Sequence, residues 1–249
     1  MTQAAVDLQV LEPGIAQVTM QDRDHKNTFS NDLIDGLVRS FDAIRDDANI
    51  KVVILTGYDT YFASGGTQER LLAIYEGKTK FTDLAIYTLP LDCRVPVIAA
   101  MQGHGIGGGF VLGLFCDFVI FSRESIYSAN FMKYGFTPGF GATYILSQKV
   151  GYSFAWELLV TAGNYRGAEL EKRGIPFPVL PRVEVPGYAL QLARQVAEKP
   201  RVSLTALKAH LAESLRQQLP TVIEKEVAMH EKTFHQPEVK ERIMTLFGK

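Results

Sequence analysis

A glycine-rich turn at residues 104–111, with the sequence HGIGGGFV, constrains the fold of this chain more than any other feature. It lies between two apolar runs, at residues 95–101 and 112–120. Together these three segments predict a strand, a tight turn and a helix. Glycine lets a ligand approach the backbone closely, and the first N–H groups of a helix favour negative charge. We therefore predict a site at this turn that stabilises an anion.

Strands and helices are predicted to alternate before and after this turn. Residues 6–11 and 15–20 predict a hairpin closed by Pro13-Gly14, and residues 51–57 and 95–101 predict buried strands. Helices are predicted at residues 31–44, which Ser30 opens, and then at 68–75, 110–117, 142–150 and 154–161. Such alternation predicts an α/β layered core with right-handed crossovers.

The composition changes at the proline-rich segment 176–181. Strand signals become rare after it, and helices are predicted at residues 187–198, 203–215 and 221–234. We therefore predict a core over residues 1–185 and a C-terminal helical region over residues 186–249.

Charge and residue usage exclude several classes of partner. The formal net charge is -1, with no basic excess to bind nucleic acid. No apolar run approaches the roughly 20 residues that a membrane span needs, and no secretion signal begins the chain, so we expect a cytoplasmic protein without membrane contacts. Cys93 and Cys116 are expected to be buried free thiols. The five histidines form no recognisable ligand set, so no metal or redox cofactor is expected.

Four segments, taken together, resemble one family. A second glycine turn, FASGGT, occupies residues 62–67, and it is accompanied by an early loop at residues 22–30 and a TPGFGA turn at residues 137–142. In their order, these segments and the first glycine turn resemble the crotonase (enoyl-CoA hydratase/isomerase) superfamily along essentially the whole chain. The resemblance implies a crotonase-like ββα spiral core with a C-terminal α-helical trimerisation region.

The resemblance also implies an oxyanion hole. The backbone N–H groups of Ser64 and Gly108 would polarise a thioester carbonyl, with Gly65 and Gly109 beside the substrate. Two such donors stabilise an enolate oxygen, and losing one donor typically costs on the order of 3 kcal/mol of barrier.

The chain departs from the hydratases of this family at two positions. Those enzymes handle water with two glutamates, which correspond here to Val111 and Phe131. Neither side chain can activate water or transfer a proton, so ordinary hydration is not expected. We predict that both form apolar walls of the substrate site.

Two further segments contain side chains that can transfer a proton. Residues 75–83, YEGKTKFTD, follow the glycine turn at residues 62–67, where the family carries a flap, and they contain Lys78 and Lys80. His230 lies on the apolar stripe of the last predicted helix. Periodicity alone favours a hydrogen-bonded core histidine over a catalytic one.

Segments 62–69, 99–104, 129–139 and 229–234 resemble one branch more closely, the decarboxylating enoyl-CoA hydratase-like enzymes of polyketide β-branching. This implies decarboxylation of a 3-methylglutaconyl-type thioester to a 3-methylcrotonyl-type thioester through a dienolate. The substrate would be carried on the phosphopantetheine of an acyl carrier protein. The lysine and histidine of that branch match Lys80 and His230, with Lys78 and His235 as alternatives.

The branch also implies other β-branching enzymes as partners, and a homotrimer or hexamer. Tyr75, Asn130 and Tyr134 are candidates for the acyl pocket, and His25 and Lys26 for the pantetheine arm. His104 is expected to be structural.

Several alternatives remain open from the sequence. The chain could be an acyl-CoA hydratase or isomerase of the same superfamily, or a non-catalytic module that binds an acyl carrier. The sequence does not decide whether Lys80 or His230 donates the proton, or whether the α,β or the β,γ double bond is formed.

Overall fold

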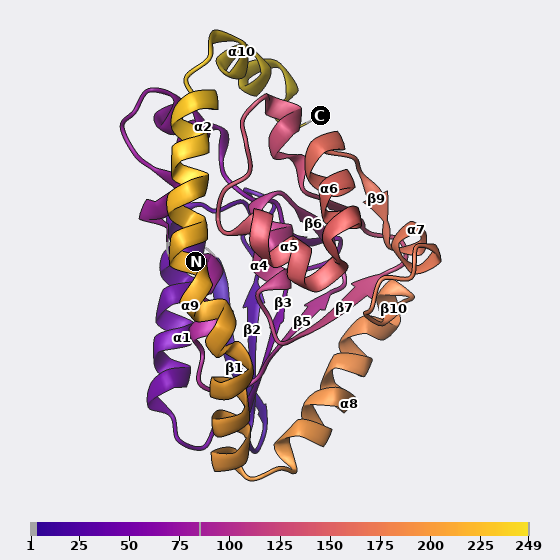
Figure 1. The fold of residues 1–249 in the computed structure, drawn as a ribbon. Coiled ribbons are helices and arrows are strands. Elements are labelled where there is room, and N and C mark those ends of the chain that lie inside the picture. The colour runs from indigo at the N-terminus through magenta and orange to yellow at the C-terminus, as the bar shows by residue number, and fades with distance from the viewer. Residues whose placement is uncertain (1–3, 85, 249) are drawn as a thin grey trace.

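The computed structural model describes residues 4–84 and 86–248. Two sheets and a set of covering helices make up the fold (Figure 1). The larger sheet has the order β1-β2-β3-β5-β7-β10, and all its pairings except the β1–β2 hairpin are parallel. Its strands are β1 (Val6–Glu12), β2 (Ile15–Met20), β3 (Val52–Thr56), β5 (Val97–Met101), β7 (Phe118–Ser122) and β10 (Val179–Leu180). The predicted hairpin and buried strands are confirmed.

The smaller sheet brings the two glycine turns together. Its strands, in the order β4-β6-β8-β9, are β4 (Tyr61–Ala63), β6 (His104–Ile106), β8 (Ile126–Ser128) and β9 (Tyr165–Arg166). β4 runs parallel to β6, so that Ala63 pairs with Gly105. A Cβ atom on Gly109 would lie only 2.1 Å from the Ala63 carbonyl oxygen, so only glycine permits this approach. The two turns, distant in sequence, are therefore neighbours in space.

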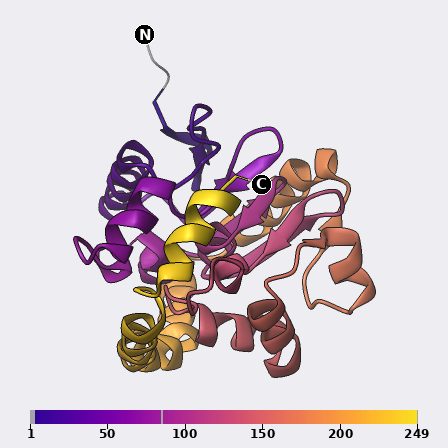
Figure 2. The ribbon, with the colours of Figure 1, turned by 90° about the horizontal axis from the view of Figure 1, so that it is seen from above.

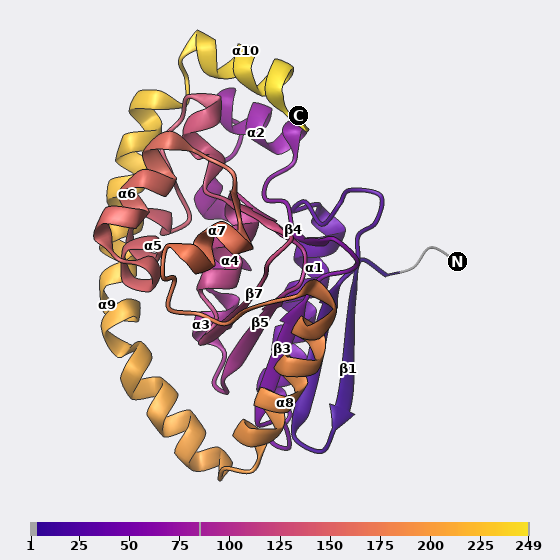
Figure 3. The same cartoon turned by 90° about the vertical axis from the view of Figure 1, so that its right-hand side faces the viewer.

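Helices cover both faces of the larger sheet (Figures 1 and 3). The predicted start of α1 is confirmed, because the Ser30 side chain accepts a hydrogen bond from the Leu33 N–H. The helices before the C-terminal region are α1 (Asn31–Asp46), α2 (Gln68–Tyr75), α3 (Leu89–Asp92), α4 (Gly108–Leu114), α5 (Ala142–Val150), α6 (Tyr152–Thr161) and α7 (Gly167–Lys172). This arrangement confirms the predicted α/β layered core.

The helix after the predicted boundary at residue 185 still belongs with the sheet. α8 (Val185–Ala197) packs its small and apolar side chains, including Ala189 and Ala193, against Ile54 and Ile98. Figure 3 shows α8 lying along β3 on one side, whereas α9 bows along the opposite side of the molecule. The division of the chain at residue 185 stays a prediction.

The prediction of two helices at residues 203–215 and 221–234 is wrong, because α9 (Arg201–Thr233) is continuous through Pro220. A proline inside a helix removes one hydrogen bond and crowds the preceding turn. Contacts just before Pro220 hold the helix in place: Leu219 is buried, and the Arg216 guanidinium donates to the Leu91 carbonyl at 2.6 Å. Tertiary packing thus overrides the local signal of the proline.

A last helix, α10 (Pro237–Leu246), was not predicted. It lies at the top of the molecule in Figures 1 and 3 and across the centre of the view from above in Figure 2. It packs against α2 and against the 3-10 helix η3 (Asn130–Tyr134). None of the helices in the described ranges is long and apolar enough to cross a membrane.

Candidate active site

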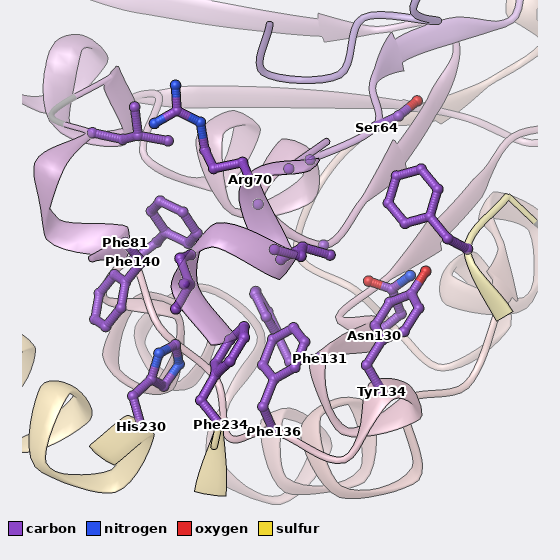
Figure 4. Close-up of a pocket in the computed structure, with 18 residues that line it drawn as sticks. Ser64, Arg70, Phe81, Asn130, Phe131, Tyr134, Phe136, Phe140, His230 and Phe234 are labelled. Atoms are coloured by element: carbon purple, nitrogen blue, oxygen red, sulfur yellow. The ribbon is translucent and has the colours of Figure 1, made fainter. Parts of the chain in front are cut away.

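An apolar cavity opens between the two glycine turns, α2, η3 and the C-terminal half of α9 (Figure 4). Its wall contains the backbone of both turns, at Gly65, Gly66, Gly107 and Gly108. Seven aromatic side chains line it, those of Phe81, Phe131, Tyr134, Phe136, Phe140, Phe234 and Phe247. Its polar side chains are Ser64, Arg70, Asn130 and His230. Among the described residues, no aspartate or glutamate lines this cavity.

The N–H group of Ser64 is not free to bind a substrate. It donates to the Asn27 carbonyl at 3.0 Å, and the Ser64 hydroxyl donates to the Lys26 carbonyl at 2.6 Å. The buried Asn27 is itself fixed by hydrogen bonds from its side chain to the Met20 and Phe62 carbonyls. The predicted donor at Ser64 is therefore corrected: its backbone ties the turn to the early loop.

Gly66, two positions after Ser64, and Gly108, the first residue of α4, both line the cavity. The N–H group of each has no acceptor among the described residues. The turns are in close contact, since a Cβ atom on Gly65 would lie 3.2 Å from the Gly108 nitrogen. This pair of free donors lies where the sequence predicts an anion-stabilising site.

His230 lies on the cavity wall in a defined tautomer. Its Nε2 is 2.6 Å from the Thr137 carbonyl oxygen, which can only accept, so Nε2 carries the hydrogen. Nδ1 is buried and has no hydrogen-bond partner in the described part of the chain. Burial lowers the pKa of His230 to about 4, although the hydrogen bond to Thr137 opposes this. The predicted position of His230 on a buried stripe is confirmed. The lone pair on its Nδ1 is available to a substrate.

The lowered pKa of His230 predicts a pH-dependent stability. Between pH 6.5 and pH 4 the unfolded chain binds a proton at His230 that the folded chain does not, so folding stability falls with falling pH. The wild type should lose about 3 kcal/mol of unfolding free energy over this window relative to His230→Gln. Chemical denaturation of both proteins at several pH values measures the difference. Parallel curves for the two proteins would contradict this prediction.

Lys80 lies next to His230 but outside the cavity of the glycine turns. Its side chain is 64% exposed, and its ammonium is 3.8 Å from the Glu231 carboxylate. Lys80, Glu231 and His235 line a neighbouring pocket, which shares His230 and Phe81 with the cavity. The Phe81 ring lies 4.4 Å from the His230 ring, at the boundary between the two spaces. Lys80 and His230 therefore both line the neighbouring pocket, but only His230 also lines the cavity of the glycine turns.

The alternative residues form local contacts. Lys78 pairs with Glu76 at 2.6 Å and lines neither space. His235 donates from Nδ1 to the Tyr75 carbonyl at 2.8 Å, and its other nitrogen lies 3.7 Å from Glu231. His235 lines the pocket of Lys80, but not the cavity.

Three of the predicted substrate-binding residues do not reach the cavity. Val111 is fully buried in α4, Gly109 packs against β4, and the Tyr75 ring lies 6.4 Å from that of His235. For Gly109 and Val111 the cause is the direction of α4: its first residue lines the cavity, and the following turn enters the core. Phe131 and Gly65 do line the cavity, as do the candidates Asn130 and Tyr134.

The remaining histidines of the site region have structural partners. His104 accepts a hydrogen bond from the Ile126 N–H at 2.9 Å, which confirms its structural role. His25 lies 2.9 Å from Asp22, and this hydrogen bond raises the pKa of His25. Both cysteines are buried and free, as predicted. No cluster of three metal-ligating side chains occurs within residues 4–84 and 86–248.

Several cavity residues were not identified from the sequence, among them Gly66, Arg70 and Phe140. Gly66 was passed over because the choice between neighbouring N–H groups depends on pairing with the early loop. Arg70 lies on α2, and its guanidinium donates to the Asn31 side chain at 2.9 Å. Phe140 adopts a positive φ of 63°, which no sequence signal indicates for a phenylalanine.

Comparison with known proteins decides the family. The family model described as enoyl-CoA hydratase/isomerase matches residues 11–247. The chain belongs to the enoyl-CoA hydratase/isomerase family.

Relatives within the enoyl-CoA hydratase/isomerase family include named decarboxylases. The chain is 64% identical over its whole length to the whole of "Bacillaene synthase decarboxylase PksI" from Bacillus subtilis (strain 168). A solved structure with 64% identity and a TM-score of 0.98 covers 98% of this chain and 100% of its own. It is described as part of a dehydratase/decarboxylase enzyme couple in polyketide β-branching. These findings confirm the predicted branch of the family.

A further solved structure supports the same branch. The ECH2 decarboxylase domain of CurF from Lyngbya majuscula is 47% identical, with a TM-score of 0.95, covering 98% of this chain and 100% of its own.

Proposed function

We propose that this chain decarboxylates a 3-methylglutaconyl-type thioester, held on an acyl carrier protein, to a 3-methylcrotonyl-type thioester. The observation that carries the proposal is a cavity with two free N–H groups, at Gly66 and Gly108, and no carboxylate side chain in the described part of its wall. Such a site can stabilise an enolate but cannot activate water. The similarity of the chain to proteins named as decarboxylases supports the same reaction.

The proposed reaction begins with the thioester oxygen between the N–H groups of Gly66 and Gly108. The bond between the distal carboxylate and the γ carbon breaks, and CO2 leaves. The electron pair passes through the conjugated double bond to the thioester oxygen, where the two N–H groups stabilise the dienolate. A proton added at the γ carbon then gives the α,β double bond, whereas a proton at the α carbon gives the β,γ isomer.

His230 and Lys80 are the proposed catalytic side chains. His230 presents a bare Nδ1 lone pair, which accepts a proton or a hydrogen bond and, once protonated, can face a carboxylate. Lys80 is cationic and exposed, and it enters the cavity only if the flap and Phe81 move. The aromatic wall excludes water and disfavours a free carboxylate, which favours its loss as CO2.

We further propose that the reaction needs no cofactor, the phosphopantetheine of the acyl carrier serving only to carry the substrate. The thioester itself accepts the electron pair that CO2 leaves behind. We also propose that other β-branching enzymes supply and receive the acyl group, which the similarity to a member of a dehydratase/decarboxylase enzyme couple supports.

A homotrimer, alone or paired as a hexamer, is also proposed. Exposed apolar side chains on α6 and α9 support association: Tyr152, Trp156 and Val160 at helical spacing, and Leu207 with Leu211. Light scattering should give particles of three or six chains, and a monomer would contradict the assembly.

The direct test incubates the chain with carrier-bound 3-methylglutaconyl thioester and follows the acyl carrier by mass spectrometry. The expected result is loss of the mass of CO2. Hydration of crotonyl-CoA, without such loss, would instead support an acyl-CoA hydratase. Carrier binding with no turnover would support a non-catalytic module. Full turnover by both Lys80→Ala and His230→Ala would overturn the assignment of catalytic residues.

Replacing Lys80 by methionine is expected to reduce kcat/KM about 30-fold, because a charge-assisted interaction with the substrate carboxylate is worth about 2 kcal/mol. Lys78→Met is the matched control, since Lys78 is an exposed lysine of the same segment and pairs with Glu76. Its activity should remain close to wild type. A larger loss for Lys78→Met than for Lys80→Met would exchange the two assignments.

A further inference from the structure

Glu226 is a buried carboxylate that lies outside the cavity wall and has no role in the proposed chemistry. Only 1% of the residue is exposed. Its Oε2 accepts from the Gly141 N–H at 2.7 Å, and its Oε1 accepts from the N–H and hydroxyl of Thr143 at 3.0 and 2.6 Å. Burial raises the pKa of the Glu226 carboxyl above its usual range. Glu226 therefore caps the N-terminus of α5 from a neighbouring helix.

Glu226 is one of three residues on a single face of α9 that bind the segment 137–143. His230 donates to the Thr137 carbonyl one turn further along the helix. The Thr233 hydroxyl lies 3.0 Å from the Thr137 hydroxyl and accepts from the Thr137 N–H at 3.3 Å. Positions 226, 230 and 233 follow the i, i+4, i+7 spacing of one helix face. The segment 137–143 is thus held against α9 at both of its ends.

The middle of this segment has a backbone that needs such support. Phe140 and Gly141 have successive positive φ values of 63° and 72°. A phenylalanine in the left-handed region is strained and persists only where its surroundings determine the conformation. Space at Gly139 is tight as well, since a Cβ atom there would lie 3.1 Å from the His230 ring. The hydrogen bonds of Glu226 begin at Gly141, directly after the strained residue.

The same segment contacts both His230 and the cavity wall beside Gly108. Thr137 at one end fixes the tautomer of His230. The Phe140 ring lies 5.4 Å from the Phe81 ring, and a Cβ atom on Gly108 would lie 3.7 Å from Phe140 Cε2. Figure 4 shows Phe140 and His230 on the same side of the cavity. A shift of this segment would therefore disturb the histidine and the wall beside the oxyanion donor together.

We propose that Glu226 is a positioning residue: its carboxylate fixes the segment 137–143, so that Thr137 holds His230 with its Nδ1 lone pair free and Phe140 lies beside Gly108. The effect that this proposal predicts on turnover rests on the proposed decarboxylation. The effect that it predicts on the tautomer of His230 is independent of that reaction.

The test is Glu226→Gln, which keeps the shape but replaces one accepting oxygen with a donating NH2 group, so that one N–H loses its partner. We expect kcat to fall about 30-fold with KM within about twofold. Nitrogen-15 NMR of labelled histidine should show the Nε2–H form of His230 in the wild type and a mixture of tautomers in the variant. The His230→Gln protein identifies the signal.

Glu224→Gln is the matched control, because Glu224 is exposed on the same helix. It should keep the wild-type kcat and tautomer. If Glu226→Gln does not fold, Thr143→Val removes only the hydroxyl donor, and should change both readouts in the same direction by a smaller amount. A folded Glu226→Gln protein, or failing that a Thr143→Val protein, with wild-type kcat and a single Nε2–H tautomer would overturn the proposal. Absence of decarboxylation in every protein, wild type included, with the expected tautomer change, would overturn the proposed function alone.

Discussion

Gly66→Pro is expected to lower kcat/KM for decarboxylation by about 10²–10³-fold, the effect of removing one oxyanion donor. Proline has no N–H group, and the N–H of Gly66 has no acceptor among the described residues, so no structural hydrogen bond is lost. Gly66 is not in the left-handed region, and the preceding Gly65 has no Cβ to clash with the proline ring.

Gly66→Ala is the matched control for this substitution. It retains the N–H group, and its new Cβ would meet only the Leu71 side chain, at an ordinary distance of 3.6 Å. We expect the alanine variant to remain within about threefold of wild type, since it changes neither donor. Equal activity in the alanine and proline variants would show that the Gly66 N–H does not bind the thioester oxygen. Thermal unfolding of both variants separates a lost donor from a lost fold.

His230→Gln is expected to reduce kcat/KM by about 10³-fold, within the range for loss of an acid–base group. The glutamine NH2 can still donate to the Thr137 carbonyl, so the contact with segment 137–143 has a replacement donor. What disappears is the Nδ1 lone pair, which is buried and has no partner in the described residues. Turnover of the carrier-bound substrate measures the loss.

His235→Gln provides the comparison for His230→Gln. His235 is partly exposed, and it lines the neighbouring pocket of Lys80 but not the cavity. Its Nδ1–H donor to the Tyr75 carbonyl can also be replaced by an amide. We expect nearly unchanged turnover. The reverse ranking of these two variants would move the catalytic role to His235.

Local patterns predicted the parts of the fold that depend on nearby residues. The hairpin, α1 and the buried parallel strands follow from apolar spacing and from Ser30 and Pro13-Gly14. The continuity of α9 could not be predicted, because the contacts of Arg216 and Leu219 that hold it around Pro220 come from distant segments.

The individual residues of the site also depend on contacts with distant segments, which local patterns do not reveal. Glycine spacing predicted the two turns, but the choice between Ser64 and Gly66 depends on Asn27 in the early loop. Periodicity placed His230 on a buried stripe, but only the Thr137 carbonyl reveals its tautomer. Lys80 was predicted from the flap, whose position against Phe81 and Glu231 is a tertiary property.

The complete burial of Val111 limits what a single substitution can do to the chemistry of the site. In hydratases of the family this position is implied to carry a glutamate, but here the side chain lies in the core and does not line the cavity. A glutamate introduced there would enter an apolar interior without a partner, at a cost of several kcal/mol. Val111→Glu alone would therefore destabilise the fold without placing a carboxylate in the cavity, so hydration cannot be installed here by one substitution.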